Sequence, residues 1–474
     1  MTPRSVHQGH APSCSATGSV VGLALLSFAG AAAVLNAFTG HFNAWAEGAP
    51  PPPGTPDPSA PTPPGSPPAG PTNAAPVGAS SAATSQTPRI RMEADGATLA
   101  WPSPPAILDL SAADAERALA AGATPIGAAS APEGALTAPN EVHIALSSRC
   151  PVRCDGCYLD AGPTEGIDAE RKALLADLDA LAALGVFEVA IGGGDAALRD
   201  DLPRVLQDIR DRGMVANLTT SGIGLSRARV QAIAPLVGQV NISLDGLGDD
   251  YIAVRGFDGA PAALRALDHL RAAGVRTGVN TVLTRVNLRG IDALADALVA
   301  HGVSEWQWIR FKPAGRGAAT YDRLVPTPGQ LHGLHQRAAA IEARTGLRVR
   351  FDCALVPWLA ADANVQVQAA QALGVAGCPG GRSLWARGAN GRFSPCSFAH
   401  HTDADPSEGV HHAWHHDPTL TAWRQRAAAP PEPCAGCDWR EVCRGGCRVV
   451  AHHLTGDALA PDPECPRVVA WEAA

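Results

Sequence analysis

The sequence of 474 residues has few charged side chains and no excess of basic ones. Only 17% of its residues are Asp, Glu, Lys or Arg, and the net charge is −8. A nucleic-acid-binding domain usually carries a basic patch that meets the phosphate backbone, so this composition argues against that class. Apolar residues make up 46% of the chain, which is enough for a sizeable folded core.

Cysteine is absent from a long stretch in the middle of the chain. There are twelve cysteines, but none lies between Cys157 and Cys353. Three form one tight group before this stretch, and most of the others lie in the last hundred residues. A secreted disulfide scaffold is short and rich in cysteine throughout. The distribution therefore favours metal ligation in a reducing compartment.

The first 90 residues lack the pattern of a folded domain. No Lys or Arg lies between Arg4 and Arg89, and residues 18–38 form an uncharged apolar run of about membrane-spanning length. A tract rich in Pro, Gly, Ala and Ser, from about 48 to 88, predicts a disordered linker. The apolar run indicates either a membrane segment or a leader-like segment. An anchor there would place the rest of the chain outside the cell. Because the distribution of cysteines favours a reducing compartment, the predicted location is instead cytoplasmic.

From about residue 140, short apolar segments alternate with amphipathic ones. Strands are predicted at 142–147, 187–191, 215–219, 240–244, 277–283 and 306–311. Helices are predicted at 168–184, 198–212, 261–273 and 289–301. This alternation predicts βαβ units and a parallel sheet, with the ligand at the carboxyl ends of the strands. The predicted fold class is α/β, a partial (β/α)6 TIM-like barrel followed by a small cysteine-rich domain.

Three cysteines, Cys150, Cys154 and Cys157, directly follow the first predicted strand; they are called the first cysteine group below. Three thiolates can hold three irons of a [4Fe–4S] cluster and leave the fourth iron open, whereas electron-transfer clusters use four cysteines. A local set of three therefore indicates chemistry at the open iron. A zinc site is the alternative, but structural zinc takes four ligands, and no fourth Cys or His lies nearby in the sequence.

Because three cysteines follow the first predicted strand at this spacing, the segment 140–320 resembles the radical S-adenosylmethionine (SAM) superfamily. The resemblance implies that S-adenosyl-L-methionine chelates the open iron of a [4Fe–4S] cluster and is cleaved to a 5′-deoxyadenosyl radical. Gly156 departs from the family's pattern, in which an aromatic or polar residue is commoner before the last cysteine. Tyr158, which follows that cysteine, is expected to supply the side chain that is missing at Gly156.

Two further motifs match the family's contacts to the methionine part of this cofactor. Gly193, Gly194 and Asp195 resemble a Gly-Gly-Glu turn that binds the amino group, with Asp one methylene shorter than Glu. Ser243 and Arg255 match the spacing of a serine and an arginine that bind the carboxylate, for which the forked guanidinium is suited. Taken without the family, this pair also fits a strand-end serine and a surface arginine.

Two other strand ends point to the same region. Residues 219–222 end the third predicted strand, where family members often contact the ribose. Residues 312–316 end the sixth predicted strand, and they either touch cofactor or substrate or only turn the chain.

The C-terminal cysteines resemble the SPASM domain, an extension of many radical SAM enzymes that carries two auxiliary [4Fe–4S] clusters. The resemblance implies one cluster on auxiliary group I, which is Cys378, Cys396 and Cys447. It implies another on auxiliary group II, which is Cys434, Cys437, Cys443 and Cys465. Cys353 is either a fourth ligand for auxiliary group I or a small core residue. A zinc ribbon built from Cys434, Cys437, Cys443 and Cys447 is the alternative.

This organisation predicts four segments: an extension (1–90), a lead-in segment (91–139), a radical SAM core (140–345) and a SPASM domain (346–474). SPASM-bearing relatives commonly modify ribosomally made peptides or proteins, so a peptide maturase with a flavodoxin or ferredoxin as electron donor is the first hypothesis. A small-molecule enzyme such as a haem-pathway decarboxylase is the second, and a non-catalytic electron carrier is the third. The sequence does not single out a general base among its many Asp and Glu residues.

Overall fold

The computed structural model describes residues 87–474 except 103–104, 128–129, 165 and 400–405. The described residues belong to one compact unit. The apolar run at 18–38 and most of the predicted linker lie outside the described residues. In the part of the chain that is described, no helix combines the length and the apolar character needed to cross a membrane.

The main sheet has nine strands in the order β11-β10-β9-β8-β7-β6-β5-β12-β13. Strands β5 to β11 are parallel, and they lie side by side in the order in which they occur in the chain. Their bounds are β5 Glu141–Ala145, β6 Glu188–Gly192, β7 Val215–Thr220, β8 Val240–Ser243, β9 Thr277–Leu283, β10 Glu305–Arg310 and β11 Arg348–Phe351. The six predicted strands are confirmed, and β11 is a seventh that the sequence pattern did not reveal.

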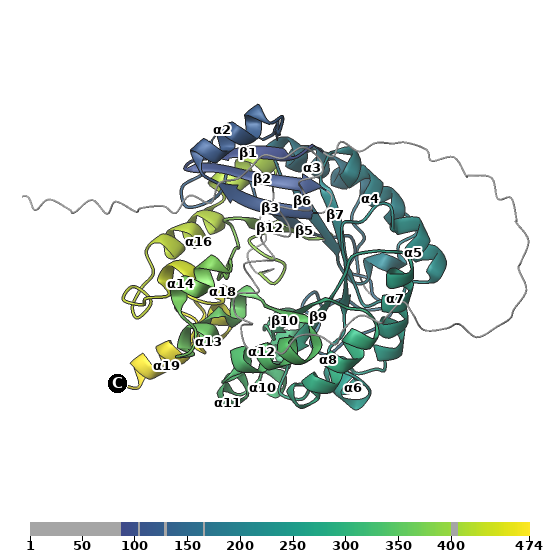
Figure 1. Cartoon of the computed structure of the whole chain (residues 1–474), viewed down its shortest axis with the longest axis vertical. Helices are drawn as coiled ribbons and strands as arrows, with labels where there is room; N and C mark the ends of the chain where they lie inside the picture. The colour runs from purple at the N-terminus through teal and green to yellow at the C-terminus, as the bar shows by residue number, and fades with distance from the viewer. Residues whose placement is uncertain (1–86, 103–104, 128–129, 165, 400–405) are drawn as a thin grey trace, which may run out of the picture. The chain divides into compact units, whose positions relative to one another are not determined.

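Helices connect these parallel strands. They are α3 Arg171–Leu184, α4 Leu202–Asp211, α5 Arg227–Ile233, α6 Asp249–Arg255, α7 Ala260–Ala272, α8 Ile291–Ala300 and α12 Leu334–Thr345. Crossovers between parallel strands are right-handed, so a sheet whose strands follow chain order carries its helices on one face. Figure 1 shows α4, α5 and α7 in succession along one side of the strands. The α/β barrel-like prediction is therefore confirmed.

The two faces of the main sheet differ because side chains alternate along a strand. On β5, Val142 and Ile144 are buried and belong to the core that also contains Leu174 and Leu178 of α3. The alternate side chains of β5 and β6 are half-exposed, and they are polar, such as His143, or small, such as Ala190. The helices thus cover the apolar face and leave a polar face available for ligands.

A separate small sheet precedes the main sheet. It contains β1 Arg89–Glu93, β2 Gly96–Pro102, β3 Pro105–Leu110 and β4 Thr124–Pro125, with helix α2 Ala112–Ala120. The strand order is β3-β2-β1-β4. The fully buried Arg91 of β1 donates to Gly185 O at 2.8 Å and to Asn140 Oδ1 at 2.7 Å, which fastens this sheet to the main one. The sequence indicated only a lead-in segment here.

Residues after β11 also contribute to the main sheet. Strand β12, Leu384–Arg387, pairs in parallel with β5, and β13, Phe393–Ser394, pairs with β12. The other elements of this region are short helices: α13 Val356–Ala361, α14 Val367–Ala372, α15 Val410–His416, α16 Pro418–Ala428, α17 Arg440–Cys443, α18 Arg448–Thr455 and α19 Pro466–Glu472. The segment predicted as a separate SPASM domain thus shares its sheet with the predicted core.

A buried ion pair ties the end of β10 to the C-terminal region. Arg310 has no exposed side-chain surface, and its Nη1 lies 2.5 Å from Asp462 Oδ2 while its Nη2 lies 2.7 Å from Glu464 Oε2. Its guanidinium carbon also lies 4.4 Å from the centre of the Trp358 ring. A buried charge is tolerated when it is paired in this way. Removing one partner leaves the other charge buried and unpaired.

We expect Arg310→Met to lower the free energy of unfolding by about 3–5 kcal/mol, because Asp462 then remains buried without its partner. The measurement is thermal unfolding under anaerobic conditions. Arg337→Met is the matched control, since Arg337 pairs with Asp292 at the surface and such pairs contribute about 1 kcal/mol or less. Equal changes in the melting temperature of the two variants would contradict the role of Arg310.

Candidate active site and the three cysteine groups

The first cysteine group lies on the loop that follows β5. Burial raises the pKa of Cys150 to about 11, and the nearby charges of Asp195, Cys154 and Cys157 add to the rise. The three thiols therefore lie close enough for the charges of Cys154 and Cys157 to affect the pKa of Cys150. Thiols in this state become ligands when a metal replaces their protons.

Residues at the end of β10 hold this loop in place. Arg316, at the start of helix α9 (Arg316–Ala319), donates from Nε to Cys154 O at 2.9 Å and from Nη2 to Ala161 O at 2.7 Å. A Cβ atom on Gly156 would lie 2.8 Å from Cε2 of Phe311, so the Phe311 ring occupies the space beside that glycine. Tyr158 instead packs against Phe398, with ring centres 4.6 Å apart. Phe311 is thus the aromatic neighbour of Gly156.

The glycines after β6 allow an unusually close approach between two backbones. A Cβ atom on Gly194 would lie 1.8 Å from Arg149 O, and one on Gly193 would lie 2.4 Å from Ser147 O. Gly194 N also donates to Ser147 O at 2.6 Å. These glycines therefore bring the turn directly against the loop of the first cysteine group. This packing requires glycine whether or not a cofactor is bound.

Asp195 follows the glycines and is buried, with hydroxyl groups from the last residue of β7 and the residue after it around it. Thr220 Oγ1 donates to Asp195 Oδ1 at 2.6 Å, Ser221 Oγ donates to Asp195 Oδ2, and Ala197 N donates to Asp195 Oδ1 at 3.2 Å. A carboxylate has about four acceptor positions, so about one remains for another donor. Thr220 and Ser221, expected near a ribose, thus orient this carboxylate.

Arg255 reaches the first cysteine group from helix α6. Its Nε lies 2.6 Å from Oδ2 of the buried Asp245, whose Oδ1 accepts from Val282 N at 2.8 Å. Burial raises the pKa of Cys154, and the Arg255 guanidinium opposes that rise. Ser243 ends β8 and pairs with Asn280 of β9. Sequence reasoning identified Arg255 but missed Asp245, which fixes its position.

Auxiliary group I gathers around a buried lysine, together with Cys353. Beyond the effect of burial, the charges of Cys378 and Cys447 raise the pKa of Cys353. Burial, Cys378 and Cys447 likewise raise the pKa of Cys396 to about 12. Lys312 acts electrostatically on Cys353, Cys396 and Cys447 and forms an ion pair with Asp352. The structure therefore places four cysteines, including Cys353, in one neighbourhood.

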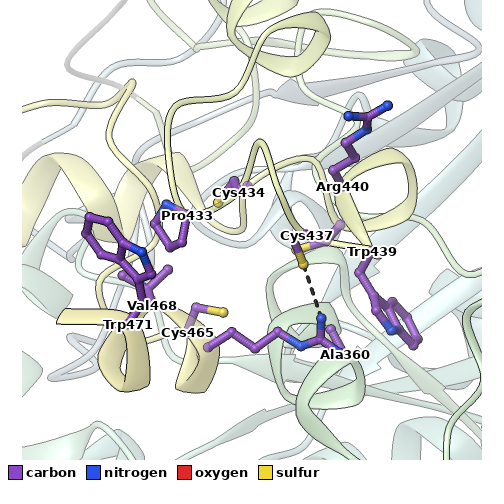
Figure 2. Close-up of a pocket in the computed structure, with 12 residues that line it drawn as sticks. Ala360, Pro433, Cys434, Cys437, Trp439, Arg440, Cys465, Val468 and Trp471 are labelled. Atoms are coloured by element: carbon purple, nitrogen blue, oxygen red, sulfur yellow. Dashed lines mark hydrogen bonds between the residues drawn. The ribbon is translucent and has the colours of Figure 1, made fainter. Parts of the chain in front are cut away.

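Auxiliary group II lines a pocket of about 200 Å³ near the C-terminus. Figure 2 shows Cys434, Cys437 and Cys465 around it, and Cys443 also lines it. Arg467 Nη1 lies 3.3 Å from Cys437 Sγ. Cys447 is not part of this lining and interacts instead with auxiliary group I. All four cysteines of auxiliary group II thus line one pocket, whereas only three of the four in the zinc-ribbon alternative do.

All eleven cysteines of the described region are free. Within the same region, no three His, Cys, Asp or Glu side chains converge closely enough to hold a single metal ion. A [4Fe–4S] cluster is several atoms wide, and its thiolates surround it instead of meeting at one point. The half-buried thiols and the pocket of auxiliary group II suit a group of that size.

Comparison with known proteins relates about 70% of the chain to radical SAM proteins. The sequence model of the radical SAM superfamily matches residues 144–298. The PqqA peptide cyclase of Ruegeria pomeroyi is 29% identical over 352 residues, which cover 71% of this chain and 90% of that protein. The PqqA peptide cyclase of Streptomyces rochei is 30% identical over 349 residues, which cover 70% of this chain and 90% of that protein.

A solved structure shares the fold. The crystal structure of Streptococcus suis SuiB bound to S-adenosylmethionine superposes with a TM-score of 0.64 at 16% sequence identity. The superposition covers 81% of this chain and 99% of SuiB. At this level of identity the likeness concerns the fold.

We expect Gly194→Ala to displace the loop of the first cysteine group, because its Cβ would collide with Arg149 O. Reconstituted protein should then lose about one third of its iron, which is one of three [4Fe–4S] clusters. Gly192→Ala is the matched control, since a Cβ atom there meets nothing within 4 Å. Iron analysis of both variants, reconstituted in parallel, makes the comparison. Full iron loading of Gly194→Ala would show that the close approach is not required.

Proposed function

Because the chain belongs to the radical SAM superfamily, we propose that it is a maturase that modifies a ribosomally made peptide. The enzyme class follows from the superfamily match and from similarity to the PqqA peptide cyclases over 90% of their length. Those relatives act, by name, on a peptide. SuiB, which shares the fold, has been crystallised with its precursor peptide SuiA. These likenesses favour a peptide over a small molecule as the substrate.

One observation carries the proposal: within the first cysteine group, Cys150 lies close enough to Asp195, and Cys154 to Arg255, for these charges to affect the pKa values of the thiols. A [4Fe–4S] cluster with S-adenosylmethionine on its open iron would supply, at this place, a 5′-deoxyadenosyl radical that abstracts hydrogen from the substrate. The free acceptor position of Asp195 would take the amino group of the methionine part. Arg255, oriented by Asp245, and Ser243 would take its carboxylate. The residues present therefore fit the group.

The two auxiliary groups would each hold a [4Fe–4S] cluster. Auxiliary group I gains Cys353 as its fourth ligand in this proposal, and auxiliary group II supplies four cysteines of its own. Four thiolates leave no open iron, which is typical of electron transfer. These clusters would therefore accept the electron that remains after the new bond forms. The Lys312 charge beside auxiliary group I would stabilise the reduced state, because added positive charge favours an added electron.

The cellular location and the electron donor of the enzyme are proposed from the same chemistry. Free cysteines in this number belong in a reducing compartment, so the proposed location is the cytoplasm. A flavodoxin or ferredoxin would there supply the electron that starts each turnover. The chain has no basic excess that would suit a nucleic-acid substrate.

The test uses the full chain, reconstituted anaerobically with iron and sulfide. It is incubated with dithionite, S-adenosylmethionine and synthetic versions of any short peptides that prove to be encoded beside its gene. We expect 5′-deoxyadenosine and a change in the mass of one peptide. Both should disappear in the Cys150/Cys154/Cys157→Ala variant and persist in Cys14→Ala, a cysteine outside all three groups. Cofactor cleavage without any change in peptide mass would contradict the assignment of a peptide substrate and would leave the enzyme class intact.

A second prediction concerns Cys353. If it is the fourth ligand of auxiliary group I, Cys353→Ala opens one iron, and the electron paramagnetic resonance spectrum of that reduced cluster should change. Cys14→Ala again serves as the control, and its spectrum should match the wild type. A wild-type spectrum for Cys353→Ala would assign Cys353 to the core instead.

A further inference from the structure

A serine, a histidine and a glutamate form a hydrogen-bonded series on the polar face of the main sheet. Nδ1 of His143, in the middle of β5, lies 2.7 Å from Ser397 Oγ. Its Nε2 lies 3.3 Å from Glu141 Oε2, and the side chains of both His143 and Glu141 are 36% exposed. The ladder neighbours of His143 are alanines, Ala190 on β6 and Ala386 on β12. Small neighbours leave the imidazole accessible from this face.

The charges around this series suit a group that takes up protons. Burial lowers the pKa of His143, but Glu141 more than offsets this, so the pKa lies above its usual value. Glu141 pairs with Glu188 in the ladder, and burial and the charge of Glu141 raise the pKa of Glu188 to about 7. Asn217 Nδ2 donates to Glu188 at 2.9 Å. The Glu141 carboxylate therefore stabilises the imidazolium that would form when His143 takes up a proton.

Ser397 lies where the first cysteine group and auxiliary group I approach each other. It follows Cys396, and it precedes Phe398, whose ring packs on Tyr158 beside Cys157. Lys312 lies 4.4 Å from the centre of the Phe398 ring. The hydroxyl of Ser397 is therefore one residue from a cysteine of auxiliary group I. It is also close in space to the loop that carries the first cysteine group.

We propose that His143, acting through the hydroxyl of Ser397, accepts the proton that the substrate loses when its new bond forms. This inference rests on the proposed function. After hydrogen abstraction, the substrate radical R• and a group X–H combine to R–X and release one proton and one electron. The electron passes to the iron–sulfur cluster of auxiliary group I. The proton passes to Ser397 Oγ as the Ser397 proton moves to His143 Nδ1, and Glu141 stabilises the resulting imidazolium.

The experiment compares His143→Ala, Ser397→Ala and wild type on the peptide that the wild-type enzyme modifies. His301→Gln is the matched control, because His301 also pairs with a carboxylate, that of Asp268 at 2.9 Å, but lies on the helical side. The readouts are iron content, modified peptide, and 5′-deoxyadenosine formed per modified peptide. Reactions are also run in D2O, where a substrate radical reduced by dithionite takes up one deuterium and remains otherwise unmodified.

We expect His143→Ala to keep full iron loading and to form about 100-fold less modified peptide, which is typical of the loss of a general base. The ratio of 5′-deoxyadenosine to product should rise, and recovered peptide should contain deuterium. Added imidazole should restore product in His143→Ala, whereas the weakly basic isostere thiazole should not. Ser397→Ala should also raise the ratio, and His301→Gln should behave as wild type.

Other outcomes overturn the inference in recognisable ways. Wild-type product yield in His143→Ala would refute it while leaving the proposed function intact. A low yield that imidazole does not restore would show that His143 only positions the loop around Ser397. If the wild-type enzyme itself modifies no peptide, the proposed function fails, and this inference fails with it.

Discussion

The handedness of the crossovers is the constraint on which the rest of this structure depends. Strands β5 to β11 lie in chain order, and right-handed connections then place every connecting helix on one face of the sheet. The apolar side chains of the strands are buried against those helices. The opposite face remains polar, and the carboxyl ends of the strands carry the first cysteine group, Asp195 and Ser243. The site is thus a consequence of the topology.

A short loop within the C-terminal region links the parts of the site. Cys396 belongs to auxiliary group I, Ser397 bonds to His143 on β5, and Phe398 packs on Tyr158 beside the first cysteine group. Three consecutive residues therefore contact three different parts of the proposed mechanism. An electron and a proton that leave the substrate together would find acceptors on adjacent residues of the chain. The buried pair of Arg310 and Asp462 holds this region against the end of β10.

Features encoded by local spacing could be predicted from the sequence. The six strands follow from periodicity, and the first cysteine group follows from its spacing. The membership of the two auxiliary groups is instead what the resemblance to the SPASM domain implies. Contacts between distant residues could not be predicted, because they depend on how the elements pack. His143 and Ser397 are 254 positions apart, and the Arg310–Asp462 pair spans 152. The glycines before Asp195 were recognised from the sequence. The packing of Gly193 against Ser147 O and of Gly194 against Arg149 O depends on the fold and could not be.

The most direct test of this account is the metal content of the anaerobically reconstituted full chain. Three [4Fe–4S] clusters require about twelve irons and twelve sulfides per chain. Replacing the cysteines of any one group by alanine should remove about four irons and leave the other two clusters spectroscopically intact. Zinc in place of iron, or iron that does not fall when a cysteine group is removed, would contradict the assignment of the three groups.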